Sequence, residues 1–321
     1  MRKSLFSCHI GAFIGFLILG LAFAEPTTAA DEMEKVVLQL KWHHQFQFAG
    51  YYAARMKGYY REEGLDVEFR EGENVDTVQQ VISGEADFGI ALSDLVLSYM
   101  NEEPVVALAT IFQHSPLVLI RKEGSASESI HDLDGSRVML ETHSEELVAY
   151  LTEMGMEEKD FILFPYKDAM QSLLNGNVDA ISAYITDEPF QLSQQNFLYQ
   201  MTSPRAVGID FYGDTLFTSR KVISENDGKV QKFRRASLKG WKYALDHPDE
   251  MISYILQNWP EGNSREALQY EAEQIQKLVR DDLIEIGYMN PGRWQHIADV
   301  YADLGIASRN VDLQRFIYTS R

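Results

Sequence analysis

Two stretches of the sequence, residues 81–89 (VISGEADFG) and residues 173–181 (LLNGNVDAI), carry the same local pattern. In each, an apolar helix end is followed by Gly, two further residues, Asp and an apolar strand. This pattern is also a common helix-to-strand turn, so it leaves a repeat and a coincidence open. Strand patterns at residues 36–40 and 137–140 precede the two copies and favour a repeat. We therefore predict two similar α/β lobes.

Strand and helix patterns alternate outward from the first copy. Leu65, Val67 and Phe69 alternate with charged residues, which is the period of a half-solvated strand. Residues 48–61 have helical spacing and end near Gly64. A β-α-β-α order of this kind predicts a mainly parallel sheet with helices on both faces.

The last third of the chain is predicted to be helical, at residues 230–245, 248–259, 265–279 and 293–304, after a strand at 211–219. The chain would then form lobe 1 from residues 35–122 and 210–321, and lobe 2 from 123–209. Two crossovers, near 120–129 and near 203–211, would join the lobes. Two crossovers make a hinge, and hinged lobes close around a ligand in a cleft.

The composition excludes several classes of protein. The chain has 321 residues, of which 45% are hydrophobic, which is enough for a packed core in one or two domains. Its 48 Asp and Glu outnumber its 29 Lys and Arg, for a formal net charge of −19. Without a run of basic residues, a chain of this charge is not a nucleic-acid-binding protein.

The N-terminus has the plan of a secretory signal peptide. Arg2 and Lys3 precede an apolar run at residues 10–24 that ends in small residues, so cleavage is expected after Ala24 or after Ala30. A membrane anchor is the alternative, but about 15 apolar residues fall short of the roughly 20 that span a bilayer. We therefore assign residues 1–24 to a signal peptide and the protein to the periplasm.

The single cysteine, Cys8, precedes the apolar run, whereas a lipidated cysteine would follow it. Cleavage would remove Cys8, so disulfides and cysteine-based zinc sites are excluded from the mature protein. An exported protein without disulfides is ordinary in a bacterial periplasm.

The carboxyl ends of the predicted strands nominate a ligand site, because ligands of open α/β sheets bind there. Lys41 and Arg137 lie inside the strands and are expected to point away from this site. The nominated residues are Trp42, His43, His44, Ser93, Asp94, Glu141, Thr142, His143, Tyr184, Thr186, Glu188, Tyr212 and Asp214.

These residue types are mostly aromatic and acidic. They favour a flat ligand with donor groups or positive charge, held by stacking and by carboxylates, and they disfavour anions. Two alternatives stay open. Trp42 and Tyr184 could be core aromatics, and Asp94 or Thr186 could be helix caps that never meet a ligand.

No catalytic constellation stands out, since the nucleophile elbow and both glycine-rich phosphate-binding motifs are absent from the sequence. The adjacent His43 and His44 cannot easily chelate one metal ion, because consecutive strand side chains diverge. His143, close to Glu145 and Glu146, allows a weak metal site, but a solvated acidic helix start is the preferred interpretation. We predict no metal and no cofactor.

Several motifs along the chain resemble those of the thiamine pyrimidine synthase-like family, which is similar to the sulfonate-binding components of ABC importers. They are residues 38–42 (LQLKW), 50–54 (GYYAA), 57–67 (KGYYREEGLDV), 82–89 (ISGEADFG) and 187–189 (DEP). The resemblance implies an α/β, type II periplasmic binding protein fold. It also implies a solute-binding role with an ABC permease and an ATPase as partners.

In members that bind aminopyrimidine precursors of thiamine, an aromatic residue and a Tyr-x-x-x-Glu motif hold the pyrimidine. Trp42, Tyr184 and Glu188 match that pattern. The resemblance implies that Trp42 and Tyr184 stack on the ligand ring and that Glu188 accepts from an exocyclic amine.

The enzymatic members use iron near a cysteine-rich run, a bound pyridoxal phosphate and a histidine, and this sequence departs from them. Residues 210–216 (DFYGDTL) contain no cysteine, and Ala91 stands where the family's lysine is expected. Without that lysine no Schiff base can form there. The chain is therefore expected to be a binding protein and not an enzyme.

Three functions follow, in order of preference. The first is a monomeric ABC importer subunit for a small aromatic nitrogenous ligand, such as a thiamine pyrimidine precursor. The second is a periplasmic sensor that signals to a partner kinase or cyclase. The third is a thiamine pyrimidine synthase.

Overall fold

The computed structural model describes residues 33–72, 75–124, 133, 135–141, 143–156, 161–164, 168–308 and 311–319. Its strands form two five-stranded sheets. The first sheet contains β1 (Glu34–Gln39), β2 (Leu65–Arg70), β3 (Phe88–Ala91), β4 (Val105–Thr110) and β10 (Thr215–Ser219). The second contains β5 (Leu117–Lys122), β6 (Ser136–Met139), β7 (Phe161–Phe164), β8 (Ala180–Tyr184) and β9 (Tyr199–Thr202).

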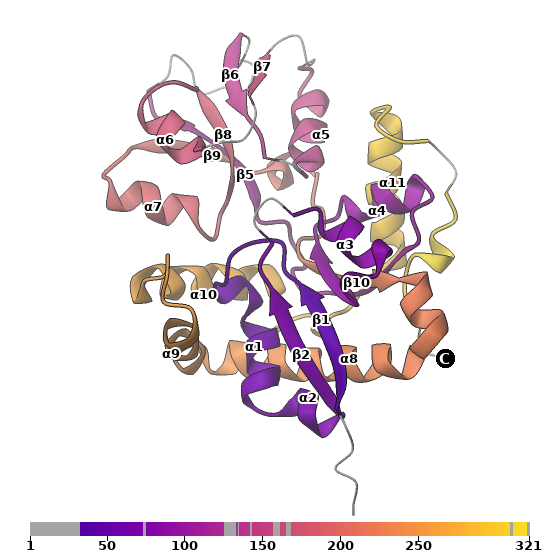
Figure 1. Ribbon diagram of the computed structural model, residues 1–321. Coiled ribbons are helices and arrows are strands. Elements are labelled where there is room, and N and C mark those ends of the chain that lie inside the picture. Colours follow the sequence, from indigo (N-terminus) through magenta and orange to yellow (C-terminus); the bar gives the residue numbers. More distant parts are fainter. Residues whose placement is uncertain are drawn as a thin grey trace, which may run out of the picture. The chain divides into compact units, whose positions relative to one another are not determined.

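The two sheets have the same topology. Their strand orders are β2-β1-β3-β10-β4 and β7-β6-β8-β5-β9, so each strand of one sheet has a counterpart in the other. In each sheet one strand, β10 or β5, runs antiparallel to both of its neighbours. The other pairings are parallel, as predicted. The prediction of two similar α/β units is confirmed, and Figure 1 shows them one above the other.

The repeated Gly-x-x-Asp turn has the same structure in both copies. Gly84 and Gly176 both have positive φ, at 87° and 71°, a conformation that favours glycine. The Asp87 carboxylate accepts from the Val37 backbone N–H at 2.8 Å, and Asp179 accepts from Arg137 N–H at 2.8 Å. Each Asp therefore ties the turn to the neighbouring parallel strand, β1 or β6.

The first passage between the sheets comes earlier than predicted. Residues 117–122 form β5, which pairs with β8 and β9, so the chain reaches the second sheet before residue 117. The crossover expected near 120–129, and the lobe boundary after residue 122, are therefore wrong. An apolar run such as LVLIRK predicts a strand but carries no information about which sheet it joins. The second passage lies between β9 and β10 and includes the expected residues 203–211.

The helices surround the sheets in the predicted order. They are α1 (Ala49–Met56), α2 (Tyr59–Glu62), α3 (Thr77–Ser83), α4 (Leu95–Met100), α5 (Glu145–Glu153), α6 (Ala169–Leu174), α7 (Glu188–Gln194), α8 (Arg220–Asp246), α9 (Pro248–Asn258), α10 (Arg265–Val279) and α11 (Pro291–Asp303). The helix expected at 48–61 is divided at Gly58, whose φ is +78°. The strand expected at 211–219 begins at Thr215.

Helix α8 crosses α1 at very short range beneath the first sheet (Figure 1). A Cβ atom on Gly240 would lie 2.1 Å from the Gly50 carbonyl oxygen, and one on Gly50 would lie 2.1 Å from the Trp241 ring. Both glycines are therefore required for this contact. The contact fixes α1 and the 41–46 loop that leads into it.

The predicted signal peptide, residues 1–24, lies outside the described residues. In the part of the chain that the structure describes, no helix combines the length and apolar character needed to cross a membrane.

Candidate functional site

Lys41, just beyond the end of β1, connects the two sheets. Its ammonium lies 3.2 Å from Asp214 Oδ1 and donates a hydrogen bond to the Tyr184 hydroxyl at the end of β8. The same ammonium lies 4.4 Å from the centroid of the Tyr184 ring. The Lys41 side chain is only 14% exposed. The expectation that Lys41 points away is wrong, because the strand ends at Gln39 and alternation no longer fixes its direction.

Asp214 lies immediately before β10 and is almost completely buried. Its second carboxylate oxygen accepts from Gln47 Nε2 at 2.8 Å. Burial raises the pKa of Asp214, and Lys41 opposes that rise. We name Lys41, Tyr184 and Asp214 the inner bridge, because these three side chains join the two sheets in a buried position.

Glu188 opens α7 and turns back toward β8. Its carboxylate accepts from the Tyr184 backbone N–H at 2.7 Å, which fixes the Tyr-x-x-x-Glu spacing as a local turn. Burial, and then the charge of Asp187, raise the pKa of Glu188 to about 8. Glu188 is therefore largely protonated at neutral pH and can both donate and accept a hydrogen bond.

A second contact between the sheets lies farther out. Asp94, before α4, and His143, before α5, form a hydrogen bond of 2.7 Å between Oδ2 and Nδ1. The His143 side chain is 45% exposed, and that of Asp94 is 14% exposed. The hydrogen bond to Asp94 raises the pKa of His143 to about 9. We name this pair the outer bridge.

Glu145 brings a third potential metal-ligating atom within 4.8 Å of those of Asp94 and His143. The His143 nitrogen in this group already shares a hydrogen with Asp94. The observed contact is thus the Asp94–His143 ion pair, and the solvated acidic helix start preferred from the sequence does not fit, because Glu145 is only partly exposed and Glu146 is buried.

The nominated residues in the loop after β1 pack in different places. Trp42 is half-buried and makes an edge contact with His43 at 5.4 Å between centroids. His44 instead stacks on Trp259 at 4.1 Å, and burial lowers its pKa to about 4. Within the described residues no ring contact joins Trp42 to Tyr184. The structure therefore supplies Trp42 and Tyr184 as separate aromatic surfaces, and it directs His44 into the packing of the C-terminal helices.

Three further nominated residues lie at strand ends. Ser93 and Thr186 are buried, at 1% and 3% exposure. The Glu141 backbone N–H donates to the Ser182 hydroxyl at 2.8 Å, and burial raises the pKa of the Glu141 carboxyl. Lys41 opposes that shift, which places Glu141 within electrostatic reach of the inner bridge. Thr142 lies outside the described residues.

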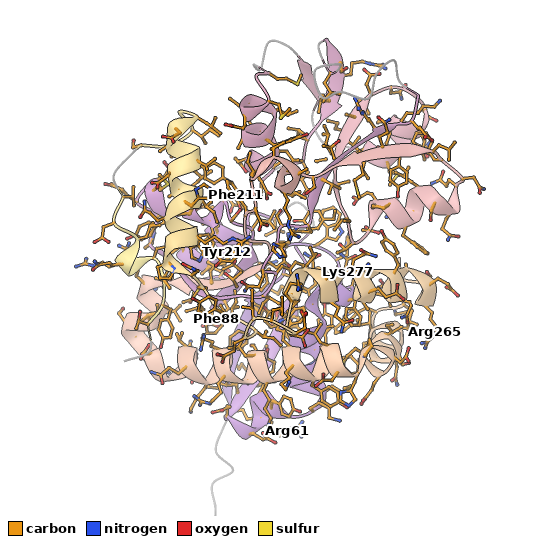
Figure 2. The ribbon with its side chains drawn as sticks, turned by 180° about the vertical axis from the view of Figure 1, so that it is seen from behind. Arg61, Phe88, Phe211, Tyr212, Arg265 and Lys277 are labelled. Carbon is orange, nitrogen blue, oxygen red and sulfur yellow. The ribbon has the colours of Figure 1, made fainter. Side chains whose placement is uncertain are left out.

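Tyr212 is a core residue. It is 1% exposed, its hydroxyl accepts from the Asn290 N–H at 3.0 Å, and its ring packs on Trp294 of α11. Figure 2 shows Tyr212 and Phe211 beside that helix. The nomination of Tyr212 as a ligand residue does not fit this position, because a strand that starts at Thr215 leaves Tyr212 in a packed connection.

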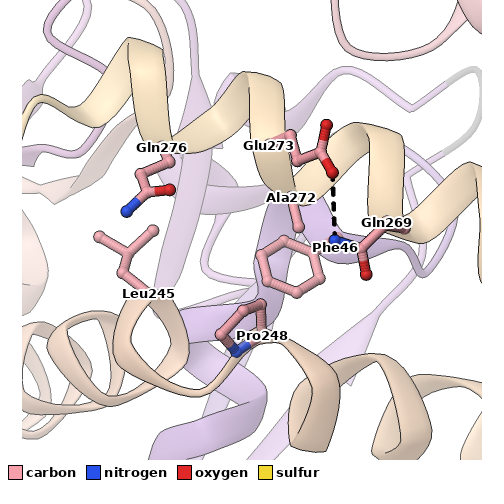
Figure 3. Close-up of a pocket in the computed structure, with 7 residues that line it drawn as sticks. All are labelled: Phe46, Leu245, Pro248, Gln269, Ala272, Glu273 and Gln276. Atoms are coloured by element: carbon pink, nitrogen blue, oxygen red, sulfur yellow. Dashed lines mark hydrogen bonds between the residues drawn. The ribbon is translucent and has the colours of Figure 1, made fainter.

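A separate hollow lies among the C-terminal helices. It has a volume of about 110 Å³ and is lined by Phe46, Leu245, Pro248, Gln269, Ala272, Glu273 and Gln276. In Figure 3, Glu273 and Gln269 on its rim are joined by a hydrogen bond of 3.2 Å. None of the nominated residues lines this hollow.

Sequence reasoning missed Lys41, a member of the inner bridge, and Gln47, which donates a hydrogen bond to Asp214. Lys41 precedes Trp42 in the motif at residues 38–42, so the sequence places Lys41 at the end of the strand. The sequence does not indicate the direction in which the Lys41 side chain points. Gln47 carried no signal, because its role depends on Asp214, which lies 167 residues away in the chain.

Comparisons with known proteins agree with this architecture. Residues 45–251 match the family described as NMT1/THI5 like. A riboflavin-binding protein, RibY, from Chloroflexus aurantiacus is 26% identical over 95% of this chain and 94% of its own length. A formylaminopyrimidine-binding protein from Halalkalibacterium halodurans is 28% identical over 82% of each chain.

The relatives also include proteins that are named as enzymes. A protein from Aspergillus parasiticus named 4-amino-5-hydroxymethyl-2-methylpyrimidine phosphate synthase is 24% identical over 67% of this chain and 68% of its own length. Among solved structures, the periplasmic aliphatic sulphonate-binding protein SsuA from Escherichia coli superposes with a TM-score of 0.67. It has 15% identity, and the match covers 88% of this chain and 97% of that one. The chain therefore belongs to the NMT1/THI5 like family and has the periplasmic binding protein fold.

Proposed function

We propose that this protein is the exported solute-binding subunit of an ABC importer and that it captures a small, flat nitrogen heterocycle. The observation that carries the proposal is the inner bridge. It brings an aromatic ring, an ammonium and a carboxylate from the strand ends of two sheets into one place. Such strand ends are where open α/β sheets bind ligands.

The site chemistry suits a heterocycle. The Tyr184 ring offers a face for stacking, and protonated Glu188 offers a donor and an acceptor at the end of the same strand. Trp42 provides a second, half-buried aromatic surface from the other sheet. Relatives that span most of the chain are named for riboflavin and formylaminopyrimidine, which supports a flat nitrogenous ligand.

A binding role is favoured over synthase activity. Ala91 ends β3, where the family's lysine is expected, so the chain provides no amine there for a Schiff base. Residues 210–216 hold no cysteine, and Tyr212 within them is packed against α11. These departures lie at the positions that the enzymatic members use.

The test is native mass spectrometry of the purified protein, followed by thermal unfolding with added riboflavin and with a formylaminopyrimidine. We expect a retained small molecule or a ligand-dependent rise in Tm, since binding to the folded state raises stability. Tyr184→Ala should abolish the rise, and Tyr288→Ala, at an exposed position, should preserve it. No shift with any nitrogen heterocycle would refute the proposed ligand class.

A further inference from the structure

The sequence predicted an acidic site for an amine-bearing ligand, whereas the structure places an ammonium at its centre. Lys41 is 14% exposed and faces Tyr184 and Asp214. Glu141 is close enough for Lys41 to act on its carboxyl. The inner bridge therefore presents a cation to whatever binds between the two sheets.

The charges near Lys41 largely cancel. Asp214, at 3.2 Å, supplies one negative charge against the ammonium. Burial raises the pKa of Glu141, the other acid within electrostatic reach of Lys41, so Glu141 contributes less charge than a solvated glutamate would. With little net negative charge, such a site is not expected to favour a cationic ligand. It suits a neutral ligand with hydrogen-bonding groups of both kinds.

We propose that Lys41 donates a hydrogen bond to the bound ligand, and that the ligand is a flat heterocycle with a ring carbonyl facing Lys41. This inference rests on the proposed function and specifies its substrate class. It replaces the expectation of an amine as the group that the site recognises first.

The number of hydrogen-bond donors on Lys41 supports its proposed contact with the ligand. A lysine ammonium has three N–H donors, and the structure shows Lys41 donating to the Tyr184 hydroxyl and lying in an ion pair 3.2 Å from Asp214 Oδ1. A charge-assisted hydrogen bond from a largely desolvated ammonium is stronger than one between neutral groups. The contact with the Tyr184 hydroxyl also brings the ammonium next to the ring on which a flat ligand would stack.

The test compares two probes by isothermal titration. Lumichrome is flat and has two ring carbonyls, and 4-amino-2-methylpyrimidine is flat and has none. We expect wild-type protein to bind lumichrome and Lys41→Met to bind it about tenfold more weakly or worse, which corresponds to the loss of one charge-assisted hydrogen bond. Any binding of the aminopyrimidine should be unchanged by this substitution.

Lys41→Met alone leaves Asp214 buried without its cation and can unfold the protein for that reason. The double variant Lys41→Met/Asp214→Asn removes both charges and keeps the partner Gln47 satisfied. If Lys41 serves only to neutralise Asp214, the double variant will bind lumichrome like wild type, and the inference is overturned. If Lys41 contacts the ligand, the double variant will fold and still bind about tenfold more weakly.

Lys239→Met is the matched control, since Lys239 is 54% exposed and pairs with Glu62 on the surface. It should bind lumichrome like wild type. Wild-type protein that binds the aminopyrimidine but not lumichrome would overturn the inference and leave the proposed function standing. Wild-type protein that binds no flat heterocycle would overturn both.

Discussion

The first and second sheets have the same topology but carry different side chains at their strand ends. Both contain the Gly-x-x-Asp turn, and both insert one antiparallel strand at the same place in the strand order. At their carboxyl ends, the first sheet supplies Lys41 and Asp214, and the second supplies Tyr184 and Glu188. The shared features hold each sheet together, and the differing features meet between them. The features common to both sheets therefore account for the fold, and the features that differ make up the candidate site.

The largest effect on stability is expected at Asp214, a buried residue of the inner bridge. Asp214→Ala removes the anion beside Lys41 and leaves a buried ammonium without a countercharge. We expect the free energy of unfolding to fall by about 3 kcal/mol, because breaking one side of a buried pair is costly. Chemical denaturation measures this loss. The exposed equivalent, Glu62→Gln, loses its pair with Lys239 and should cost about 0.5 kcal/mol.

Glu188, next to the second sheet, should make the stability of the protein depend on pH. Burial raises the pKa of Glu188 from 4.5 to about 8, so the folded state holds a proton that the unfolded state releases above pH 4.5. Stability should therefore decrease as the pH rises from about 4.5 to about 8. Glu188→Gln removes this dependence and should gain about 2 kcal/mol relative to wild type between pH 5 and pH 6.5, at about 1.4 kcal/mol per pH unit. Parallel pH profiles for the two proteins would contradict a buried, protonated Glu188.

The outer bridge should respond to pH in its own window. Asp94 raises the pKa of His143 from 6.5 to about 9, with Glu145 and Asp76 adding smaller contributions. The stabilisation is complete below pH 6.5 and is lost as the pH rises through about 9. Because His143 is half-exposed, we expect only about 1 kcal/mol. His143→Gln should be less stable than wild type at pH 6 and equal to it at pH 10, measured by urea denaturation.

The shared turn should give the smallest and most equal effects. Gly84→Ala and Gly176→Ala place a side chain at positive φ, and in neither case does the added Cβ approach another atom closely. Each should cost about 1 kcal/mol through backbone strain alone. Unequal Tm shifts would show that the two turns contribute differently to stability. That result would contradict the structural equivalence of the two sheets.

Sequence patterns predicted the features that depend on local chemistry. Periodicity located α10 at residues 265–279, and the paired turns at Gly84 and Gly176 indicated the duplication. The assignment of β5 to a sheet was missed, because strand pairing is a long-range choice that an apolar run does not encode.

Side-chain direction after a strand ends was missed for the same reason. Lys41 was expected to point away and Tyr212 to face the ligand, and the structure reverses both. Contacts with Asp214 and with α11, far along the chain, decide these two directions. The nominated residues that meet between the sheets were found because strand ends could be located from the sequence.

The central claim is that the strand ends of the two sheets form one ligand site around Tyr184. The most direct measurement is an isothermal titration of the purified protein with lumichrome, comparing wild type with Tyr184→Ala and with the exposed-position control Tyr288→Ala. We predict saturable binding with one site per chain in wild type and in the control. Tyr184→Ala should bind at least tenfold more weakly, the loss expected for a stacking platform that is also a hydrogen-bond partner of Lys41. Equal affinity in all three proteins would contradict the account.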